Sequence, residues 1–319
     1  MKKYLPIFVT LGFVIVGITY LYTHEEQLAI MQQLQWMDVL WVFLLMLAFF
    51  LNVGYTFKLS VNLLTIRLNW IETFGLSFMT TFGNYLGPMS PGSSVMKPVY
   101  LKSIKNLSYT NYAAILAATI FIFGFMDGFT GLILLFLKSD ATIPLILWLL
   151  CLGLIVGSSL PFAVPVPTMS KQGKIANLLK ATVEGFSIIR TSKHKLVIIC
   201  LTIVVQHIIG GMMTQVLYQG LHVPLSFLDA IMLRVFISMA NLFTITPNNI
   251  GIQEVVTGFL FSAIGLDFAT GVLGAGVARA IHVAITFLFT PVFMLLMLKK
   301  AGITVSDLSG SNPDKIMSG

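Results

Sequence analysis

Apolar runs long enough to cross a membrane dominate this chain. One of them, ILAATIFIFGFMDGFTGLILLFL from Ile115 to Leu137, holds a single charged residue. About 20 apolar residues in a helix span the hydrocarbon core of a bilayer, and several runs here approach that length. Hydrophobic residues make up 57% of the sequence and charged residues only 10%. The chain is therefore predicted to be an all-α polytopic membrane protein, with lipids and not nucleic acid around it.

The distribution of lysine and arginine predicts how the chain is threaded, because cytoplasmic loops of membrane proteins carry an excess of both. Lys2 and Lys3 precede the first apolar run. The loop after that run has only acidic charges, Glu25, Glu26 and Asp38. Both termini are therefore expected on the cytoplasmic side of the inner membrane. About six full spans are expected, at 4–22, 39–57, 112–137, 143–164, 196–217 and 268–297.

The apolar stretch 71–86 is too short for a full span. As a helix it would reach about 24 Å, whereas the hydrocarbon core is roughly 30 Å thick. Three helix-breaking residues follow it, Pro88, Pro91 and Gly92. Lysines and the basic segment 165–195 come next, and a full crossing would place all of them outside. A re-entrant hairpin over 71–104 that enters from the cytoplasm keeps these charges inside.

A second hairpin is expected at 225–264, entering from the opposite face. Its break, TPNNIG, contains Pro247 and Gly251. Shifting the first hairpin by 156 positions places Pro91 on Pro247. Two copies that enter from opposite faces form an inverted repeat, the pattern of secondary transporters whose broken helices meet near the midplane.

Residues 1–300 are expected to form a single transmembrane domain, with the two copies at about 39–137 and 196–297. The segment 165–195 between them is basic and has apolar residues on one helical face. It is expected to lie on the anionic inner surface of the membrane. Residues 301–319 are rich in polar and small residues and are predicted to be a disordered tail.

Arg279, near the centre of the final span, is the leading candidate site residue. A charged side chain at the centre of a membrane helix costs about 2.5–3.5 kcal/mol on insertion scales, so it needs a partner. Glu254 is the first candidate for that partner and Asp127 the next. His282 lies three residues beyond Arg279 and shares its face. Further donors around the same cavity are expected from Arg234, Gln253, Asn248 and Asn249.

Most of these residues also have a purely structural interpretation. The pair Arg279 and Glu254 can pin the hairpin to the bundle as readily as it can bind substrate. Lys97 has two possible interpretations. It can be one of the cytoplasmic charges that orient the chain in the membrane, or it can bind an anionic lipid headgroup at the cytoplasmic end of the cavity. His207 and Gln206 are better explained by interhelical hydrogen bonds. Small residues in the final span are expected to allow close packing, namely Gly271, Gly274, Ala275, Ala278 and Ala284.

Two motifs carry a resemblance to a known family. They are LGPMSPGSSVMKPVYLK, and TPNNIGIQEVVTGFL with ARA further along the chain. Both resemble conserved runs of the lysylphosphatidylglycerol synthase transmembrane-region family, often described as flippase-like. Lys97 stands where arginine is usual in that family, SSVM replaces the acidic residue common in its first break, and FIFGF replaces a Glu-Arg pair before Asp127. The resemblance implies roles for Pro247, Gly251, Glu254, Arg279, Pro91, Lys97 and Asp127.

No enzyme signature, cofactor motif or metal-ligand spacing is present in the sequence. The resemblance implies a flippase-like protein, which would translocate a phospholipid or lipid-linked intermediate without ATP hydrolysis. Membrane lipids with anionic headgroups are then the expected ligands. Two alternatives stay open: a non-transporting membrane partner of a separate glycosyltransferase or synthase, and a small-solute secondary carrier.

Overall fold

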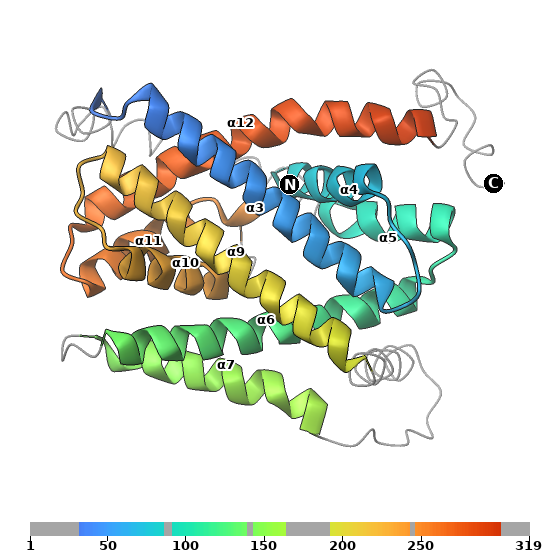
Figure 1. Ribbon diagram of the computed structural model, residues 1–319, viewed down its shortest axis with the longest axis horizontal. Coiled ribbons are helices and arrows are strands. Elements are labelled where there is room, and N and C mark those ends of the chain that lie inside the picture. Colours follow the sequence, from blue (N-terminus) through green and yellow to red (C-terminus); the bar gives the residue numbers. More distant parts are fainter. Residues whose placement is uncertain (1–31, 86–90, 139–142, 164–191, 243–245, 301–319) are drawn as a thin grey trace, which may run out of the picture.

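The computed structural model describes residues 32–85, 91–138, 143–163, 192–242 and 246–300 (Figure 1). Within these ranges the chain is helical and contains no strand. The helices are α3 (Trp36–Asn62), α4 (Trp70–Tyr85), α5 (Pro91–Lys105), α6 (Tyr109–Leu137), α7 (Leu145–Ala163), α9 (Lys193–Gly220), α10 (Phe227–Asn241), the 3-10 turn η1 (Pro247–Asn249), α11 (Ile252–Ala263) and α12 (Phe268–Lys300).

Four of these helices, α3, α6, α9 and α12, are long and apolar enough to cross a membrane. They coincide with four of the six expected spans, so the chain is a multi-pass membrane protein. At the fifth, α7 is a shorter apolar helix. The first expected span, most of the basic segment and the tail at 301–319 lie outside the described residues.

Polar side chains start several helices by accepting hydrogen bonds from backbone N–H groups that have no partner inside the helix. The Ser108 hydroxyl accepts from the N–H of Asn111 at 3.1 Å and so begins α6. At the start of α4, the Asn69 side chain accepts from the N–H of Glu72 at 2.9 Å, and Glu72 accepts from the N–H of Asn69 at 2.8 Å. Such reciprocal caps fix where a helix begins within an apolar run.

The helix bounds repeat along the chain at the spacing of 156 residues seen in the sequence. Shifted by that amount, α3 would cover 192–218 and α4 would cover 226–241, which nearly reproduces α9 and α10. The shifted α5 covers 247–261, where η1 and α11 are found. Helices α3 to α6 and helices α9 to α12 therefore have nearly the same bounds after the shift, and these two sets are called the first and second copy.

The contacts between helices follow the same correspondence between the two copies. Helix α4 packs against α12, and its counterpart α10 packs against α6, the counterpart of α12. Helices α3 and α9 pack against each other across the centre. The pairs α3 with α12 and α6 with α9 are in contact as well. This exchange is expected of two copies related by an approximate two-fold axis.

Figure 1 shows the two short helix pairs approaching from opposite ends of the molecule. Helices α4 and α5 have their outer ends at one end of the bundle, and α10 and α11 have theirs at the other. The inner ends of both pairs lie near the middle. Pro91 and Gly92 were expected to interrupt the first pair, but α5 begins at Pro91, where proline is favoured because its missing N–H would have no helical partner. Pro88 lies outside the described residues.

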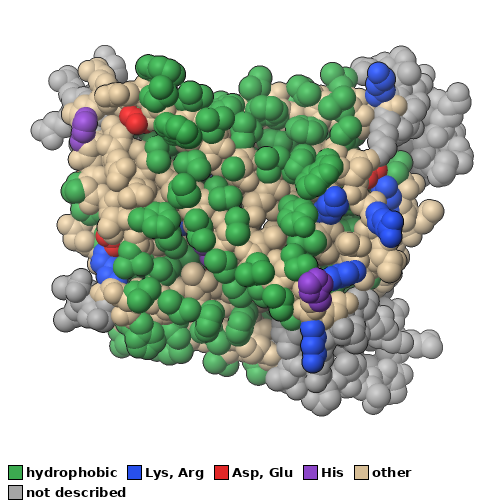
Figure 2. Space-filling model, viewed as in Figure 1, with side chains coloured by type: hydrophobic (Ala, Val, Ile, Leu, Met, Phe, Trp, Pro, Cys, Tyr) green, Lys and Arg blue, Asp and Glu red, His purple; other side chains and the backbone are tan. Residues whose placement is uncertain are grey.

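The visible surface between the two ends is mostly hydrophobic (Figure 2). Leu145 and Ile146 of α7 are each 71% exposed, as expected of side chains that face lipid tails. Lysine and arginine gather at one end, where α3 and α5 finish and α6 and α9 begin. This basic end carries Lys58, Arg67, Lys102, Lys105, Lys193, Lys195 and Lys299.

Glycines allow close approach at two helix contacts. A Cβ atom added to Gly274 of α12 would lie 2.2 Å from Cε1 of Tyr218 on α9. The Tyr218 hydroxyl donates to the carbonyl of Gly271 at 2.7 Å. In α6, a Cβ on Gly128 would lie 2.8 Å from the carbonyl oxygen of Cys151 in α7. The close packing predicted for Gly271 and Gly274 is confirmed.

Candidate functional site

The break between α10 and α11 is a tight turn built from residues that tolerate left-handed backbone. Asn248 and Asn249 have φ of 46° and 53°, and Gly251 has φ of 83°. Asparagine and glycine adopt these angles at lower cost than other residues. The Thr246 hydroxyl closes the turn by donating to the carbonyl of Ile250 at 2.8 Å. The carbonyls of both asparagines accept hydrogen bonds from one donor on a neighbouring helix.

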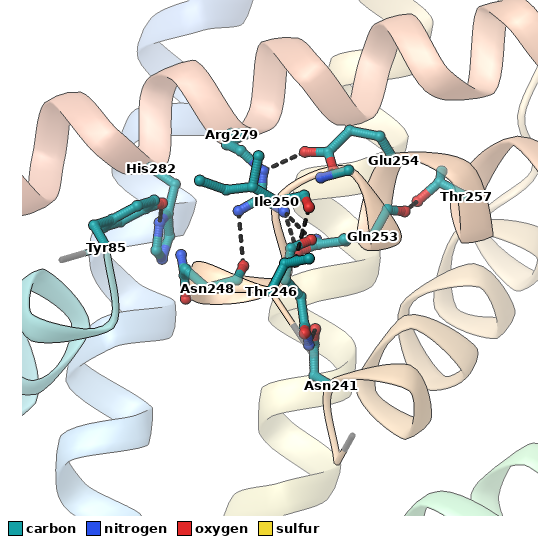
Figure 3. Close-up of polar contacts among 12 residues, drawn as sticks. Tyr85, Asn241, Thr246, Asn248, Ile250, Gln253, Glu254, Thr257, Arg279 and His282 are labelled. Atoms are coloured by element: carbon teal, nitrogen blue, oxygen red, sulfur yellow. Dashed lines mark hydrogen bonds and ion pairs between the residues drawn. The ribbon is translucent and has the colours of Figure 1, made fainter. Parts of the chain in front are cut away.

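Arg279 of α12 is that donor (Figure 3). Its Nη1 donates to the carbonyl of Asn248 at 3.0 Å, and its Nη2 to the carbonyl of Asn249 at 3.3 Å. Nη2 also donates to Oε1 of Gln253 at 3.0 Å. Nε forms an ion pair with Oε1 of Glu254. The predicted partner of Arg279 is therefore confirmed, and each nitrogen of the guanidinium has an acceptor.

Both carboxylate oxygens of Glu254 have bonding partners. Its second oxygen, Oε2, accepts from the N–H of Gly251 at 2.7 Å and so caps the start of α11. The side chains of Glu254 and Arg279 are only 14% and 13% exposed. In such surroundings an ion pair is screened little by water, and removing one partner leaves an uncompensated charge. Arg279 and Glu254 thus fasten the break to α12.

The inner end of α4 meets the same turn. Tyr85, the last residue of α4, bonds through its hydroxyl to Nδ1 of His282 at 2.5 Å. Figure 3 shows Tyr85 and His282 next to Asn248. The His282 ring also stacks on Phe50 of α3, with centroids 5.0 Å apart. Tyr85 was not anticipated from the sequence, where it is one aromatic residue among many in an apolar run.

A cavity of about 580 Å³ lies where the inner ends of the two helix pairs come together. All the helices of both copies contribute to its wall. It is lined by Met46, Phe49, Thr80, Asn84, Lys97, Tyr112, Leu116, Ile120, Met213, Arg234, Asn241, Asn248, Asn249, Gln253, Ala278, Arg279 and His282. Of the residues expected to bind substrate, Glu254 and Asp127 are not among the described lining residues. The structure therefore brings together most of the side chains singled out in the sequence.

The charged side chains in the cavity wall are all basic. Lys97, Arg234 and Arg279 line it, and no aspartate or glutamate is among the described lining residues. Arg234 stacks over the Phe49 ring at 4.4 Å, and the Lys97 ammonium lies 4.1 Å from the centre of the Phe57 ring. Side-chain amides of asparagine and glutamine supply the rest of the polar surface. Such a lining suits a ligand with negative charge and hydrogen-bonding oxygens.

Asp127 does not belong to the Arg279 site. It is fully buried, and its Oδ1 lies 2.8 Å from Nε2 of His207 on α9. Its Oδ2 accepts from the Ser238 hydroxyl of α10 at 2.9 Å. The expectation that Asp127 could serve as a partner of Arg279 is wrong, because α6 faces α9 and α10 at this level. The predicted interhelical hydrogen bond of His207 is confirmed.

Glu72 holds the first helix pair together and was not singled out in the sequence. It forms an ion pair with Lys105 at 3.0 Å and accepts from the Tyr100 hydroxyl at 3.1 Å. Lys102 instead lies over the ring of Tyr109, 4.4 Å from its centre. The only signal for Glu72 in the sequence was its place three residues after Asn69, the spacing of a helix cap.

Comparison with known families agrees with this structure. The model of the family described as Lysylphosphatidylglycerol synthase TM region matches residues 7–289. The chain belongs to the lysylphosphatidylglycerol synthase transmembrane-region family. The match covers every described residue that lines the cavity, from Met46 to His282. No curated protein and no solved structure matches the chain.

The family assignment agrees with the resemblance carried by the two break motifs. In this member of the lysylphosphatidylglycerol synthase transmembrane-region family, Gly251, Glu254 and Arg279 meet in one hydrogen-bonded cluster. Lys97, at the position where arginine is usual, lies in the cavity wall. Among the described residues, no group of three or more histidine, cysteine, aspartate or glutamate side chains could hold a metal ion.

Proposed function

We propose that this protein translocates a phospholipid or lipid-linked intermediate across the cytoplasmic membrane without ATP hydrolysis. The observation that carries the proposal is the polar, basic cavity at the inner ends of two broken helix pairs, inside a body whose visible face between its two ends is mostly hydrophobic (Figure 2). Irregular backbone and charged groups at membrane depth are tolerated where protein buries them or where they line a wet cavity. A cavity of this kind gives a polar headgroup a path through the hydrocarbon region.

The proposal includes a topology of six full spans and two re-entrant hairpins in an inverted repeat. The opposite approach of α4–α5 and α10–α11 in Figure 1 supports it. The gathering of lysine and arginine at one end supports a cytoplasmic location for that end. Both termini would then be cytoplasmic. In this arrangement the cavity lies near the bilayer midplane, where repeat transporters bind their substrates.

The cavity volume suggests which part of a lipid it would hold. Pockets of about 300–1000 Å³ accommodate molecules of drug size, and this cavity has about 580 Å³. That volume suits a headgroup, and the acyl chains would stay in the bilayer. Leu116 and Ile120 of α6 line the cavity and are 45% and 48% exposed, so they offer an apolar flank for the chains. Translocation of this kind breaks no bond and needs no cofactor.

Reconstitution into liposomes tests this proposal directly. Vesicles would contain acyl-labelled fluorescent phospholipids, and a membrane-impermeant quencher would report the label in the outer leaflet. Wild-type protein is expected to expose inner-leaflet label. Ala278→Phe should block this, because Ala278 lines the cavity and a phenylalanine there would fill part of it. Ala284→Phe is the matched control, since Ala284 lies on the same helix and is exposed on the surface.

The outcome separates the three functional classes. Translocation that is lost only in Ala278→Phe supports the lipid pathway. Equal activity of Ala278→Phe and wild type would contradict a path through this cavity. If wild-type protein moves no phospholipid, lipid translocation is not its function for these substrates. A small-solute carrier or a membrane partner of a separate glycosyltransferase or synthase would then be the better account.

A further inference from the structure

We infer that Lys97 and Arg234 form an anion-binding pair in the cavity, which makes the protein select negatively charged headgroups over cationic, aminoacylated ones. This inference rests on the proposed function and names its substrate class. The phosphate of the lipid headgroup would bind two side chains from different copies, Lys97 on α5 and Arg234 on α10. Arg279, the most conspicuous cation of the sequence, has a different role.

Arg279 is already satisfied without a ligand. Its guanidinium nitrogens bond to Glu254, to the carbonyls of Asn248 and Asn249 and to Gln253. A phosphate could bind Arg279 only by replacing acceptors that hold the turn in place. Exchanging one set of charge-assisted hydrogen bonds for another yields little net free energy.

Arg234 and Lys97 are in the opposite situation. Both line the cavity, and neither has a hydrogen bond or ion pair among the described residues. The Nε atom of Arg234 is buried without an acceptor. Among the described residues, Arg234 lies over the face of Phe49 and Lys97 over the face of Phe57. A cation withdrawn from water and supported only by an aromatic ring lacks the charge-assisted bonds that a phosphate would supply.

In and beside the cavity, no carboxylate among the described residues is free to receive a cationic headgroup. Glu254 uses one oxygen for Arg279 and the other for the N–H of Gly251. Asp127 lies close enough to attract Arg234 through space, but its oxygens bond to His207 and Ser238. Neither acidic residue is in the described cavity wall. The ammonium group of a lysyl headgroup would be repelled by the positive charges of Lys97 and Arg234. Like-charge repulsion of this kind is a common way for proteins to discriminate against a ligand.

Neutral amides complete the anion site. Asn84 and Gln253 lie in the cavity wall, and Asn249 donates to Oδ1 of Asn241 at 3.1 Å. Amide groups can donate to phosphate oxygens and also accept from headgroup hydroxyls. The combination of two unpaired cations with amides fits a phosphate-bearing headgroup that carries hydroxyl groups, such as phosphoglycerol.

The test compares acyl-labelled phosphatidylglycerol, which is anionic, with acyl-labelled lysylphosphatidylglycerol, which is cationic, in the liposome assay. Wild type is expected to move phosphatidylglycerol at least tenfold faster. Lys97→Gln and Arg234→Gln should each slow phosphatidylglycerol by roughly tenfold or more, since each removes a charge-assisted contact. The conservative exchanges Lys97→Arg and Arg234→Lys should restore most of the rate. Lys102→Gln is the matched control, because Lys102 is on the same helix and over an aromatic ring but outside the cavity wall.

Equal wild-type rates for the two lipids would overturn the inference while leaving lipid translocation intact. So would phosphatidylglycerol rates that are unchanged in Lys97→Gln and Arg234→Gln. If wild type moves no lipid, the proposed function fails, and binding then decides the inference. Short-chain dihexanoyl phosphatidylglycerol should raise the unfolding temperature of purified wild type but not of Arg234→Gln. An equal rise with inorganic phosphate alone would identify a small-anion site and contradict a lipid headgroup as the ligand.

Discussion

Arg279 on α12 pairs with Glu254 on α11, and the same guanidinium binds the backbone carbonyls of the turn that precedes α11. One side chain therefore compensates both a buried carboxylate and two carbonyls outside any helix. This arrangement explains how an irregular turn persists inside a membrane-embedded bundle, where unsatisfied backbone groups are costly.

Removing Arg279 should destabilise the protein. Arg279→Ala is expected to lower the free energy of unfolding by about 3 kcal/mol, because it leaves the charge of Glu254 uncompensated. Glu254→Gln should cost less, since the amide oxygen can still accept from Arg279. The double variant Arg279→Met with Glu254→Met should be less destabilised than the sum of its single variants. Thermal unfolding in detergent compares wild type with Arg279→Ala, Glu254→Gln, the double methionine variant and its two single methionine variants. A wild-type melting temperature for Arg279→Ala would refute the fastening role.

The contact between Gly274 and Tyr218 is expected to limit side-chain size. Gly274→Ala should destabilise the protein by about 1–3 kcal/mol, because the new methyl would overlap the Tyr218 ring. Gly276→Ala on the same helix serves as the control, since a Cβ there has no atom within 4 Å. Thermal unfolding of the two alanine variants measures the difference. Equal stability of both would show that α9 and α12 are not packed as closely as described.

Asp127 should be important for stability and not for binding the headgroup. Asp127→Asn is expected to lower the free energy of unfolding by about 2 kcal/mol, because it weakens bonds to His207 and Ser238. Asp267→Asn should be nearly neutral, since Asp267 is an exposed helix cap and asparagine caps as well. Chemical unfolding compares the two variants. An unchanged midpoint for Asp127→Asn would mean that this buried cluster contributes little.

The proposed inverted topology predicts opposite accessibility for two exposed serines near the outer ends of α5 and α11, Ser103 and Ser262. In a background with both native cysteines replaced by alanine, Ser262→Cys should react with an impermeant maleimide in spheroplasts. Ser103→Cys should react only after the membrane is permeabilised. Labelling of both from the same side would rule out hairpins that enter from opposite faces.

Much of the helical framework could be predicted from the sequence because a bilayer leaves few choices. Apolar runs without charges must satisfy their backbone internally, so 112–137 and 268–297 were predictable as helices. The spacing of 156 residues between Pro91 and Pro247 was also visible, and the helix bounds follow it. Of the residues expected to break the first pair, Pro91 and Gly92 instead lie at the start of α5, because proline can begin a helix as well as end one.

Partner choice between side chains could only be partly predicted. Glu254, in the second hairpin, was the leading candidate for Arg279, and this pairing is present. Asp127, in the matching span of the first copy, was ranked next. Because α6 packs against α10 and contacts α9, Asp127 instead bonds to His207 and Ser238. The contribution of Tyr85 could not be predicted, since nothing in an apolar run marks the residue that ends beside a distant turn.

The sequence by itself determined that this is a helical membrane protein and predicted two related halves, because apolar length, charge placement and spacing are properties of the chain read along its length. Only the tertiary structure decided which charges have hydrogen-bonded partners. Arg279 and Arg234 look alike in the sequence. They differ because the turn before α11 supplies acceptors to Arg279, whereas Arg234 lies over the ring of Phe49 in the cavity wall.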